Sequence, residues 1–241
     1  MKVLIYYVVT TESHLEEFIS DFAPVSQFDY ALFTSVPLHV KPERLEVIHI
    51  EERDGLNLRQ LSRVAKMNPQ KFLDLSSYHY SIYADSNIQV APDVLSYLDR
   101  SKPVVLFKHN RRNFLLSEIC YCYYTGKMSF VIMLKTIWQS QSLKFRKGLY
   151  QGGLLIRKSN NAIVEKLNSS WYDNYLRLTT DRDQISLAMA VYPLKQQIKV
   201  VNQVLHSSEG ITLRAHDKVV YDLKGDLLQR LFVFVRKIKS K

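Results

Sequence analysis

Short apolar runs alternate with segments of helical period along most of this chain. The run KVLIYYVV (Lys2–Val9) is continuously apolar, which is typical of a strand that is covered on both faces. Further strands are predicted at Asp29–Ser35, Leu45–Glu51, Tyr80–Asp85, Pro103–His109 and Leu154–Lys158. Helices are predicted in the intervals, at His14–Phe22, in part of Asn57–Leu73, from Pro92 onward and within Thr179–Tyr192.

The segment Asn57–Leu73 shows the helical pattern most clearly. Leu58, Leu61 and Val64 or Ala65 share one face, and the basic residues Arg59, Arg63 and Lys66 fall largely off it. Pro69 restricts the residue before it and is expected to break the helix.

This alternation indicates an α/β fold with a mainly parallel, Rossmann-like central sheet. The 241 residues are 46% hydrophobic, enough for one substantial core. We expect one domain over residues 1–221 and a basic amphipathic helix or tail over residues 222–241. In such sheets ligands bind beyond the carboxyl ends of the strands.

The stretch YHYSIYADSNIQV places polar residues at such a strand end. On an extended chain, residues two apart point the same way, so Asp85 and Asn87 would face one cation or one ribose together. Carboxylate and amide oxygens suit Mg²⁺ or Mn²⁺. The alternative is a plain turn, because Asp, Ser and Asn all favour turns.

Two further short motifs are candidates. Gly152 and Gly153 precede a predicted strand, where they either let the backbone approach a ligand or form an ordinary turn. Arg182, Asp183 and Gln184 fall on the first turn of a predicted helix. There Asp183 either complements the helix dipole or serves as a carboxylate at a pocket edge.

The net charge of +10 indicates a phosphate-bearing partner: nucleic acid, anionic lipid or a nucleotide. The loop with Lys108, His109 and Arg112 can hold phosphates, or can be a solvated basic loop. Because the basic residues are dispersed and no nucleic-acid-binding motif occurs, nucleic acid is the less favoured partner.

The remaining features concern location and redox state. The first apolar run is shorter than the roughly 18 residues of a spanning helix and lacks a cleavage site, so we expect a cytoplasmic protein. Cys120 and Cys122, expected on a strand or loop, are poorly placed to bridge and are predicted to be reduced.

Two amphipathic segments have open interpretations. The aromatic-rich segment Tyr121–Phe145 is either an acceptor lid or a core helix. The tail Asp226–Lys241 has an apolar face and a basic end. It either lies in a membrane interface, at the inner membrane face, or packs in the core or a homodimer.

Taken together, these segments resemble a glycosyltransferase-like family first catalogued as a domain of unknown function, from bacterial surface-polysaccharide loci and plant cell-wall matrix synthesis. The similarity covers about Asp29 to Tyr192 and rests on the order of the segments. They are DYALFTS, then Arg63, Lys66 and Pro69, YSIYADSNIQV, the Lys108–Arg112 loop with Glu118, QGGLLIR, and Trp171 followed by RDQISL. The sequence departs from the family pattern at Asn110, Leu116 and Gln151, and in the loop after the first strand.

The resemblance implies a GT-A transferase that moves a sugar from a nucleotide-sugar donor to a hydroxyl of a glycan or a lipid-linked glycan. It implies Mn²⁺ or Mg²⁺ on Asp85, with Asn87 and His206 as further ligands and His216 as second choice for the latter. An ordinary surface histidine is the alternative for both. Asp183 and Asp85 would be the catalytic carboxylates. The donor would be held by Arg63, Lys66, Asp85, Lys108, His109, Arg112, Gly152, Gly153, Arg182 and Gln184. A non-catalytic, donor-binding relative is the alternative.

Overall fold

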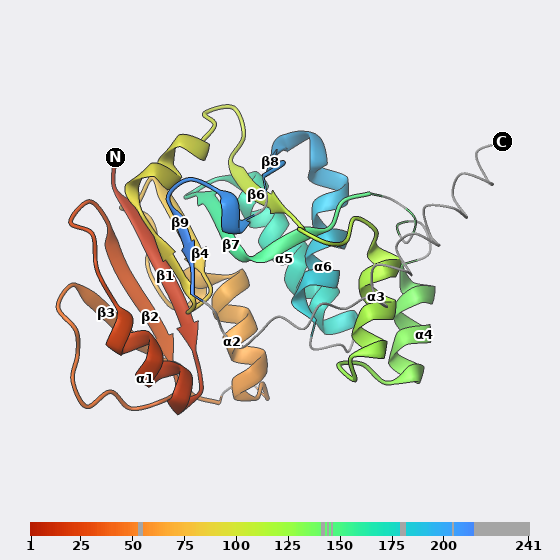
Figure 1. The fold of residues 1–241 in the computed structure, drawn as a ribbon, viewed down its shortest axis with the longest axis horizontal. Coiled ribbons are helices and arrows are strands. Elements are labelled where there is room, and N and C mark those ends of the chain that lie inside the picture. The colour runs from red at the N-terminus through yellow and green to blue at the C-terminus, as the bar shows by residue number, and fades with distance from the viewer. Residues whose placement is uncertain are drawn as a thin grey trace.

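A seven-stranded sheet forms the centre of the molecule in this computed structural model (Figure 1). The structure describes residues 1–52, 55–140, 143, 145, 147–178, 182–203 and 205–214. The strands follow the order β3-β2-β1-β4-β7-β6-β8. Their bounds are β1 Val3–Val9, β2 Asp29–Thr34, β3 Leu45–His49, β4 Tyr80–Ala84, β6 Val104–Lys108, β7 Tyr150–Lys158 and β8 Ile198–Val201. A small second sheet pairs β5 (Ile88–Val90) with β9 (Ile211–Leu213).

Most of the central sheet is parallel, as the alternating pattern predicted. Strands β1 to β4 pair in parallel, as do β6 and β8. Strand β7 is the exception, because it runs antiparallel to both of its neighbours. It therefore begins where β4 ends, which brings its first residues to the carboxyl edge of the sheet.

Helices cover both faces of this sheet (Figure 1). Their bounds are α1 Glu12–Asp21, α2 Leu58–Met67, α3 Leu115–Tyr124, α4 Phe130–Gln139, α5 Ala162–Leu178 and α6 Asp183–Val191. Short 3₁₀ turns are η1 Pro69–Lys71, η2 Pro92–Tyr97, η3 Tyr192–Gln197 and η4 Leu205–Ser207. The segment from Pro92, predicted as an α-helix, is thus a 3₁₀ turn.

Strand β1 shows how one apolar run serves two cores. Its alternate side chains from Val3 to Val9 pack with α1 on one face, whereas Leu4 and Tyr6 pack with α2, α5 and α6 on the other. This is the both-faces burial that the continuous apolar run predicted. A third apolar cluster joins α3, α4 and α6 beside the sheet.

Three local expectations are corrected by the structure. Cys120 and Cys122 lie on α3, not on a strand or loop, and both are free thiols. The glycines Gly152 and Gly153 lie within β7, not before it. Lys66, expected off the apolar face, is buried, because α2 is covered by the sheet on one side and α5 on another.

The expected tail, residues 222–241, lies outside the described residues, so its boundary with the domain stays a prediction. Among the helices that the structure describes, none is long and apolar enough to cross a bilayer.

Candidate functional site

Asp85 stands at the carboxyl end of β4, at the centre of the sheet edge where ligands are expected. Its backbone N–H donates to the carbonyl of Gly153, and its own carbonyl accepts from the N–H of Ile88, both at 2.8 Å. The second bond closes a turn over Asp85–Ile88. The extended geometry expected for Asp85 and Asn87 is therefore wrong, whereas the role of Asp85 as a ligand stays a prediction.

A buried lysine links two carboxylates at this edge. The Nζ of Lys66 lies 2.7 Å from an oxygen of Asp183 and 3.7 Å from an oxygen of Asp85. Only 4% of the Lys66 side chain is exposed, against 13% for Asp183 and 44% for Asp85. The ammonium also lies 4.7 Å from the ring centroid of Tyr83, within cation–π range. The site thus joins residues from α2, β4 and α6 around one cation.

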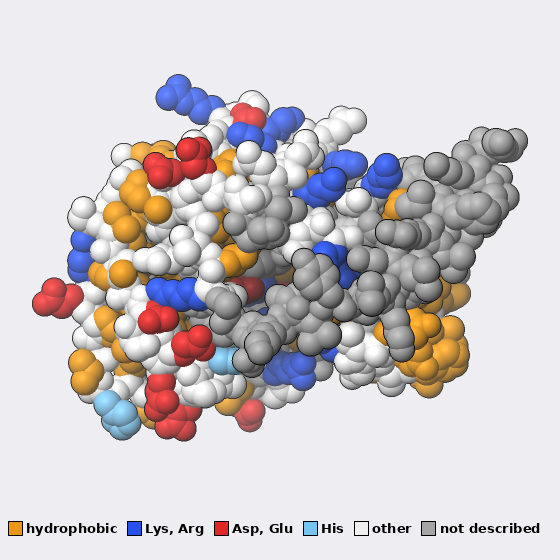
Figure 2. Space-filling view, viewed as in Figure 1, with side chains coloured by type: hydrophobic (Ala, Val, Ile, Leu, Met, Phe, Trp, Pro, Cys, Tyr) orange, Lys and Arg blue, Asp and Glu red, His pale blue; other side chains and the backbone are white. Residues whose placement is uncertain are grey.

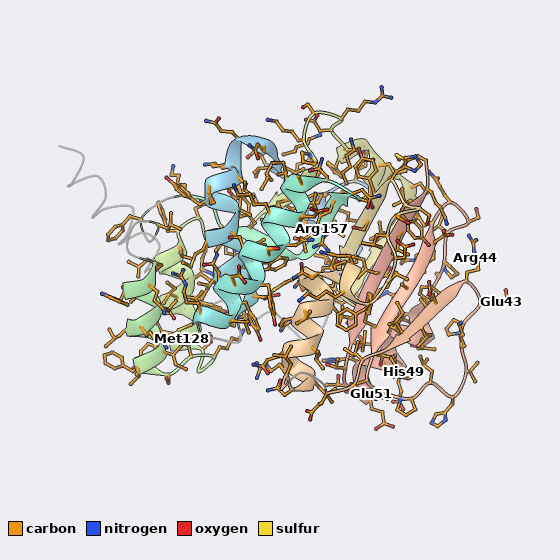
Figure 3. All side chains as sticks on the ribbon, turned by 180° about the vertical axis from the view of Figure 1, so that it is seen from behind. Glu43, Arg44, His49, Glu51, Met128 and Arg157 are labelled. Atoms are coloured by element: carbon orange, nitrogen blue, oxygen red, sulfur yellow. The ribbon has the colours of Figure 1, made fainter. Side chains whose placement is uncertain are left out.

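Lys66 is held in place by groups that bind the end of α2. The buried guanidinium of Arg157 donates to the carbonyls of Lys66 and Met67 and to Oδ1 of Asn168. The hydroxyl of Tyr6 donates to the Lys66 carbonyl as well. Arg157 lies in the interior (Figure 3), where burial lowers its pKa to about 9.

Arg157 was not among the residues predicted from the sequence. The signal was present, since a single Arg interrupts the apolar strand LLIRK. A lone charge inside a buried strand requires paired partners. Here those partners are backbone carbonyls about 90 residues earlier in the chain.

Asp183 is ionised in this arrangement. Burial alone would raise its pKa, but the charges of Lys66 and Arg63 outweigh that effect and hold the pKa well below its usual range. A strong general base has a pKa near the working pH. The environment of Asp183 therefore suits a hydrogen-bond acceptor better than a base.

Glycine at position 153 leaves room for the close approach of the Asp85 side chain. A Cβ at Gly153 would lie 2.8 Å from Oδ2 of Asp85 and 3.2 Å from Cδ1 of Ile88. At Gly152 the nearest atom would be the Nζ of Lys66, at an ordinary 3.5 Å. Asp85 is also fixed by Tyr83, whose hydroxyl donates to Oδ1 at 2.6 Å.

The two neighbouring glycines make a matched pair of variants. We expect Gly153→Ala to lower the free energy of unfolding by about 1–3 kcal/mol, because the methyl group displaces the carboxylate. Gly152→Ala should change it by less than about 0.5 kcal/mol. Urea unfolding of both variants measures the difference, and equal stabilities would show that Asp85 does not pack against Gly153 as described.

A cavity of about 580 Å³ opens beside this cluster. It is bounded by the ends of β1 and β4, the loop after β1 and the outer side of α2. Its lining residues are Val8, Val9, Thr10, Thr11, His14, Leu58, Arg59, Ser62, Arg63, Tyr83 and Ser86. The Nε of Arg63 is buried and has no hydrogen-bond partner among the described residues. A buried donor without a partner points to an acceptor that a ligand would supply.

The three residues of the RDQ motif each tie α6 to a different element. Arg182, the N-cap residue, lies 3.8 Å from Glu118 of α3. Asp183 pairs with Lys66 of α2, and the amide of Gln184 donates to the carbonyl of Tyr150 in β7. The expected first-turn position of Asp183 is confirmed, and the motif sets the place of that carboxylate in the site.

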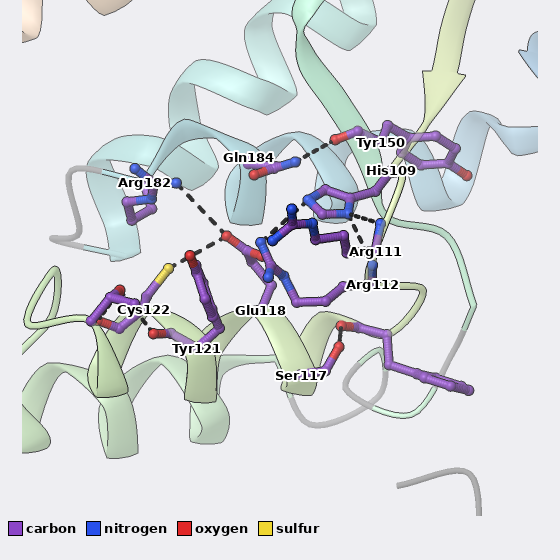
Figure 4. Close-up of polar contacts among 12 residues, drawn as sticks. His109, Arg111, Arg112, Ser117, Glu118, Tyr121, Cys122, Tyr150, Arg182 and Gln184 are labelled. Carbon is purple, nitrogen blue, oxygen red and sulfur yellow. Dashed lines mark hydrogen bonds and ion pairs between the residues drawn. The ribbon is translucent and has the colours of Figure 1, made fainter. Parts of the chain in front are cut away.

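Two residues of the Lys108–Arg112 loop, His109 and Arg112, are buried and have partners inside the protein (Figure 4). Arg112 is buried, donates to the fully buried Glu118 at 2.5 Å and stacks 3.7 Å from the ring centroid of Tyr121. Nδ1 of His109 accepts from the backbone N–H groups of Arg111 and Arg112. His109 and Arg112 thus have internal partners, whereas Lys108, at the end of β6, is partly exposed, and the donor-binding role expected for all three stays a prediction.

Because His109 is buried, we expect the stability of the fold to depend on pH. Burial, together with the charge of Arg112, lowers its pKa to about 4. Between pH 6.5 and 4 the unfolded chain binds a proton that the folded chain does not, so stability falls as the pH falls. The loss for this shift is about 3 kcal/mol.

Urea unfolding between pH 7 and pH 4.5 measures this effect. His109→Asn is the matched variant, because its Oδ1 accepts the same backbone bonds without titrating. We expect a shallower pH dependence in the variant. The same slope in both proteins would contradict the assignment.

The metal site expected on Asp85, Asn87 and His206 stays a prediction. Among the described residues, no group of three His, Cys, Asp or Glu side chains is placed to hold a metal ion. The N–H of Arg214, which follows β9, donates to the carbonyl of Asn87, so this end of β9 lies beside the Asp85 turn. The turn η4 precedes the opposite end of β9, which pairs with Val90. The side chain of His206 and all of His216 lie outside the described residues.

Comparison with known proteins gives information on the fold of this chain. No protein-family model matches the chain, and no curated protein matches it. Among solved structures, it is similar to the WbbM bifunctional glycosyltransferase in its apo form, with a TM-score of 0.53 and 9% identity. The likeness covers 83% of this chain but 38% of that one, so this chain spans well under half of that protein. At this identity it shows the fold alone, which confirms the expected α/β, GT-A-like architecture.

Proposed function

We propose that the protein is a glycosyltransferase that moves a sugar from a nucleotide-sugar donor to an acceptor hydroxyl in surface-polysaccharide synthesis. One observation carries the proposal: the linked carboxylates Asp85 and Asp183 lie at the carboxyl edge of the sheet beside a large cavity lined by Arg59 and Arg63. The similar solved structure, described as a bifunctional glycosyltransferase, supports it through the shared fold.

The cavity suits the nucleotide part of the donor. Its threonines and serines offer hydroxyl groups, and Arg63 offers a buried Nε–H that has no hydrogen-bond partner in the described part of the chain. Guanidinium groups bind phosphate oxygens strongly. The diphosphate would then lie between Arg63 and the exposed face of Asp85.

A divalent cation fits this arrangement when the donor itself supplies most of the ligands. Mg²⁺ is commonly bound through one or two carboxylates together with substrate phosphates. Of the two site carboxylates, Asp85 has the more exposed side chain and would hold the ion. Bound there, Mn²⁺ or Mg²⁺ would neutralise the charge that develops on the leaving diphosphate.

Asp183 would accept a hydrogen bond from a hydroxyl of the donor sugar. Its low pKa and its pairing with Lys66 favour this role over proton abstraction. Lys66 keeps the two carboxylates together while neutralising part of their charge. Gly152 and Gly153 leave the adjoining strand surface without side chains, which gives the Lys66 ammonium and the Asp85 carboxylate room beside it.

A panel of nucleotide-sugars, each with and without Mn²⁺, tests the proposal by thermal shift and by release of nucleoside diphosphate. We expect one donor to raise the melting temperature and to be turned over when an acceptor is added. Binding without turnover would favour the non-catalytic relative. No shift with any donor would contradict the proposed function.

A further inference from the structure

The hairpin formed by α3 and α4 has an outer face that is as apolar as its inner one. In α4, Val131 and Trp138 are 73% and 69% exposed, and Phe130 and Leu134 are exposed as well. The fully buried residue of this helix is Thr136, a polar one. Tyr123 and Tyr124 at the end of α3 extend the surface. Figure 2 shows hydrophobic side chains gathered at this end of the molecule.

The exposed charged side chains of the hairpin are all positive. Between Leu115 and Ser140 the sequence has one acid, Glu118, which is fully buried against Arg112. Its two basic residues, Lys127 and Lys135, are exposed. A contiguous apolar surface on a monomer marks an interaction site. With aromatic residues and lysines on it, and no exposed acid, it has the composition of a membrane-interface helix.

We propose that this face, defined by Tyr123, Tyr124, Phe130, Val131, Leu134 and Trp138, docks the protein on an anionic lipid surface. The apolar side chains enter the headgroup region, and Lys127 and Lys135 contact lipid phosphates.

Charge favours lipid over the two protein occupants. A second copy placed face to face would add two more lysines to the interface and no exposed acid to pair with them. The sequence from Asp226 to the end carries one acid and five basic residues, so it too would repel Lys127 and Lys135. Anionic lipid complements the surface twice, because its acyl region accepts the apolar side chains and its headgroups pair with the lysines.

Docking through this hairpin would also orient the site. Helix α3 carries Glu118, which lies 3.8 Å from Arg182, the neighbour of Asp183. The site would therefore be held near the lipid surface. If the proposed function holds, this position favours an acceptor carried on a lipid.

The two tryptophans give a direct test in the full-length chain. Trp138 is exposed on the docking face, whereas Trp171 is fully buried in the core. Vesicles of phosphatidylglycerol and phosphatidylcholine, without any donor, should shift the Trp emission to the blue. Brominated lipids should quench it. Trp138→Phe should keep the binding but lose the quenching.

Substitutions measure the contribution of the face. Leu134→Asp with Trp138→Asp should weaken vesicle binding at least about tenfold, because two apolar anchors are lost. Leu176→Asp, which changes an exposed apolar residue on α5, should leave binding unchanged. Unchanged thermal unfolding would show that both variants are folded.

Three results would overturn the proposal. One is the absence of vesicle binding. Another is binding without quenching of Trp138, which would place the contact elsewhere on the chain. The third is a dimer in sedimentation that the aspartate variants dissociate. Because no donor is present, failure here is distinct from failure of the proposed transferase activity.

Discussion

Replacing Lys66 by Met is expected to lower the free energy of unfolding by about 3–5 kcal/mol at neutral pH. The variant leaves Asp183 ionised and buried without the cation that lies 2.7 Å away in the native protein. Lys166→Met, on an exposed position of α5, is the control and should have little effect. Urea unfolding at pH 7 measures both.

The pH dependence of that loss identifies its cause. In the native protein the pKa of Asp183 is lowered, so its stabilisation is present above its unfolded value of about 4 and is lost as the pH falls through the folded-state pKa. Without Lys66 the pKa of Asp183 is higher than in the native protein, because only Arg63 and Arg182 then oppose the effect of burial, and protonation relieves the penalty. The difference between variant and native protein should shrink toward pH 4. Adding Asp183→Asn to Lys66→Met should recover most of the lost free energy of unfolding. A double variant as unstable as Lys66→Met alone would contradict the pairing of Lys66 with Asp183.

Asp85→Asn is expected to reduce sugar transfer by about 10²–10³-fold with little change in stability. The amide oxygen can still accept from the Tyr83 hydroxyl, and the side chain is 44% exposed, so the fold is preserved. What is lost is the charge at the donor diphosphate. Asp173→Asn, an exposed carboxylate on α5, controls for a general change in charge. Transfer at the native rate by Asp85→Asn would show that this carboxylate has no part in the reaction.

The architecture was predictable because its signals are local. Continuous apolar runs such as Val3–Val9 predicted buried strands, and the order of strands and helices predicted a mostly parallel sheet. Polar residues after β4 then pointed to the edge where Asp85 lies. The antiparallel course of β7 was not predicted, because strand direction depends on pairing partners distant in the sequence.

The geometry of the site was less predictable, because its contacts join distant segments. Lys66 and Asp183 are 117 positions apart, and the helical period of α2 marked Lys66 as off the apolar face. A helix covered on more than one side buries such a residue if a partner is present. Likewise, the loop around Arg112 has the composition of a solvated turn, and only Glu118 and the packing of α3 make its burial favourable.

In the proposed function, Asp85 and the adjoining cavity bind a nucleoside diphosphate group. The most direct measurement is calorimetric titration of nucleoside diphosphates, with and without Mn²⁺, into the native protein and Asp85→Asn. We expect Mn²⁺ to strengthen binding to the native protein and not to the variant, with affinities that converge when the ion is removed. Equal affinity of both proteins in Mn²⁺, or no binding of any nucleoside diphosphate, would contradict it.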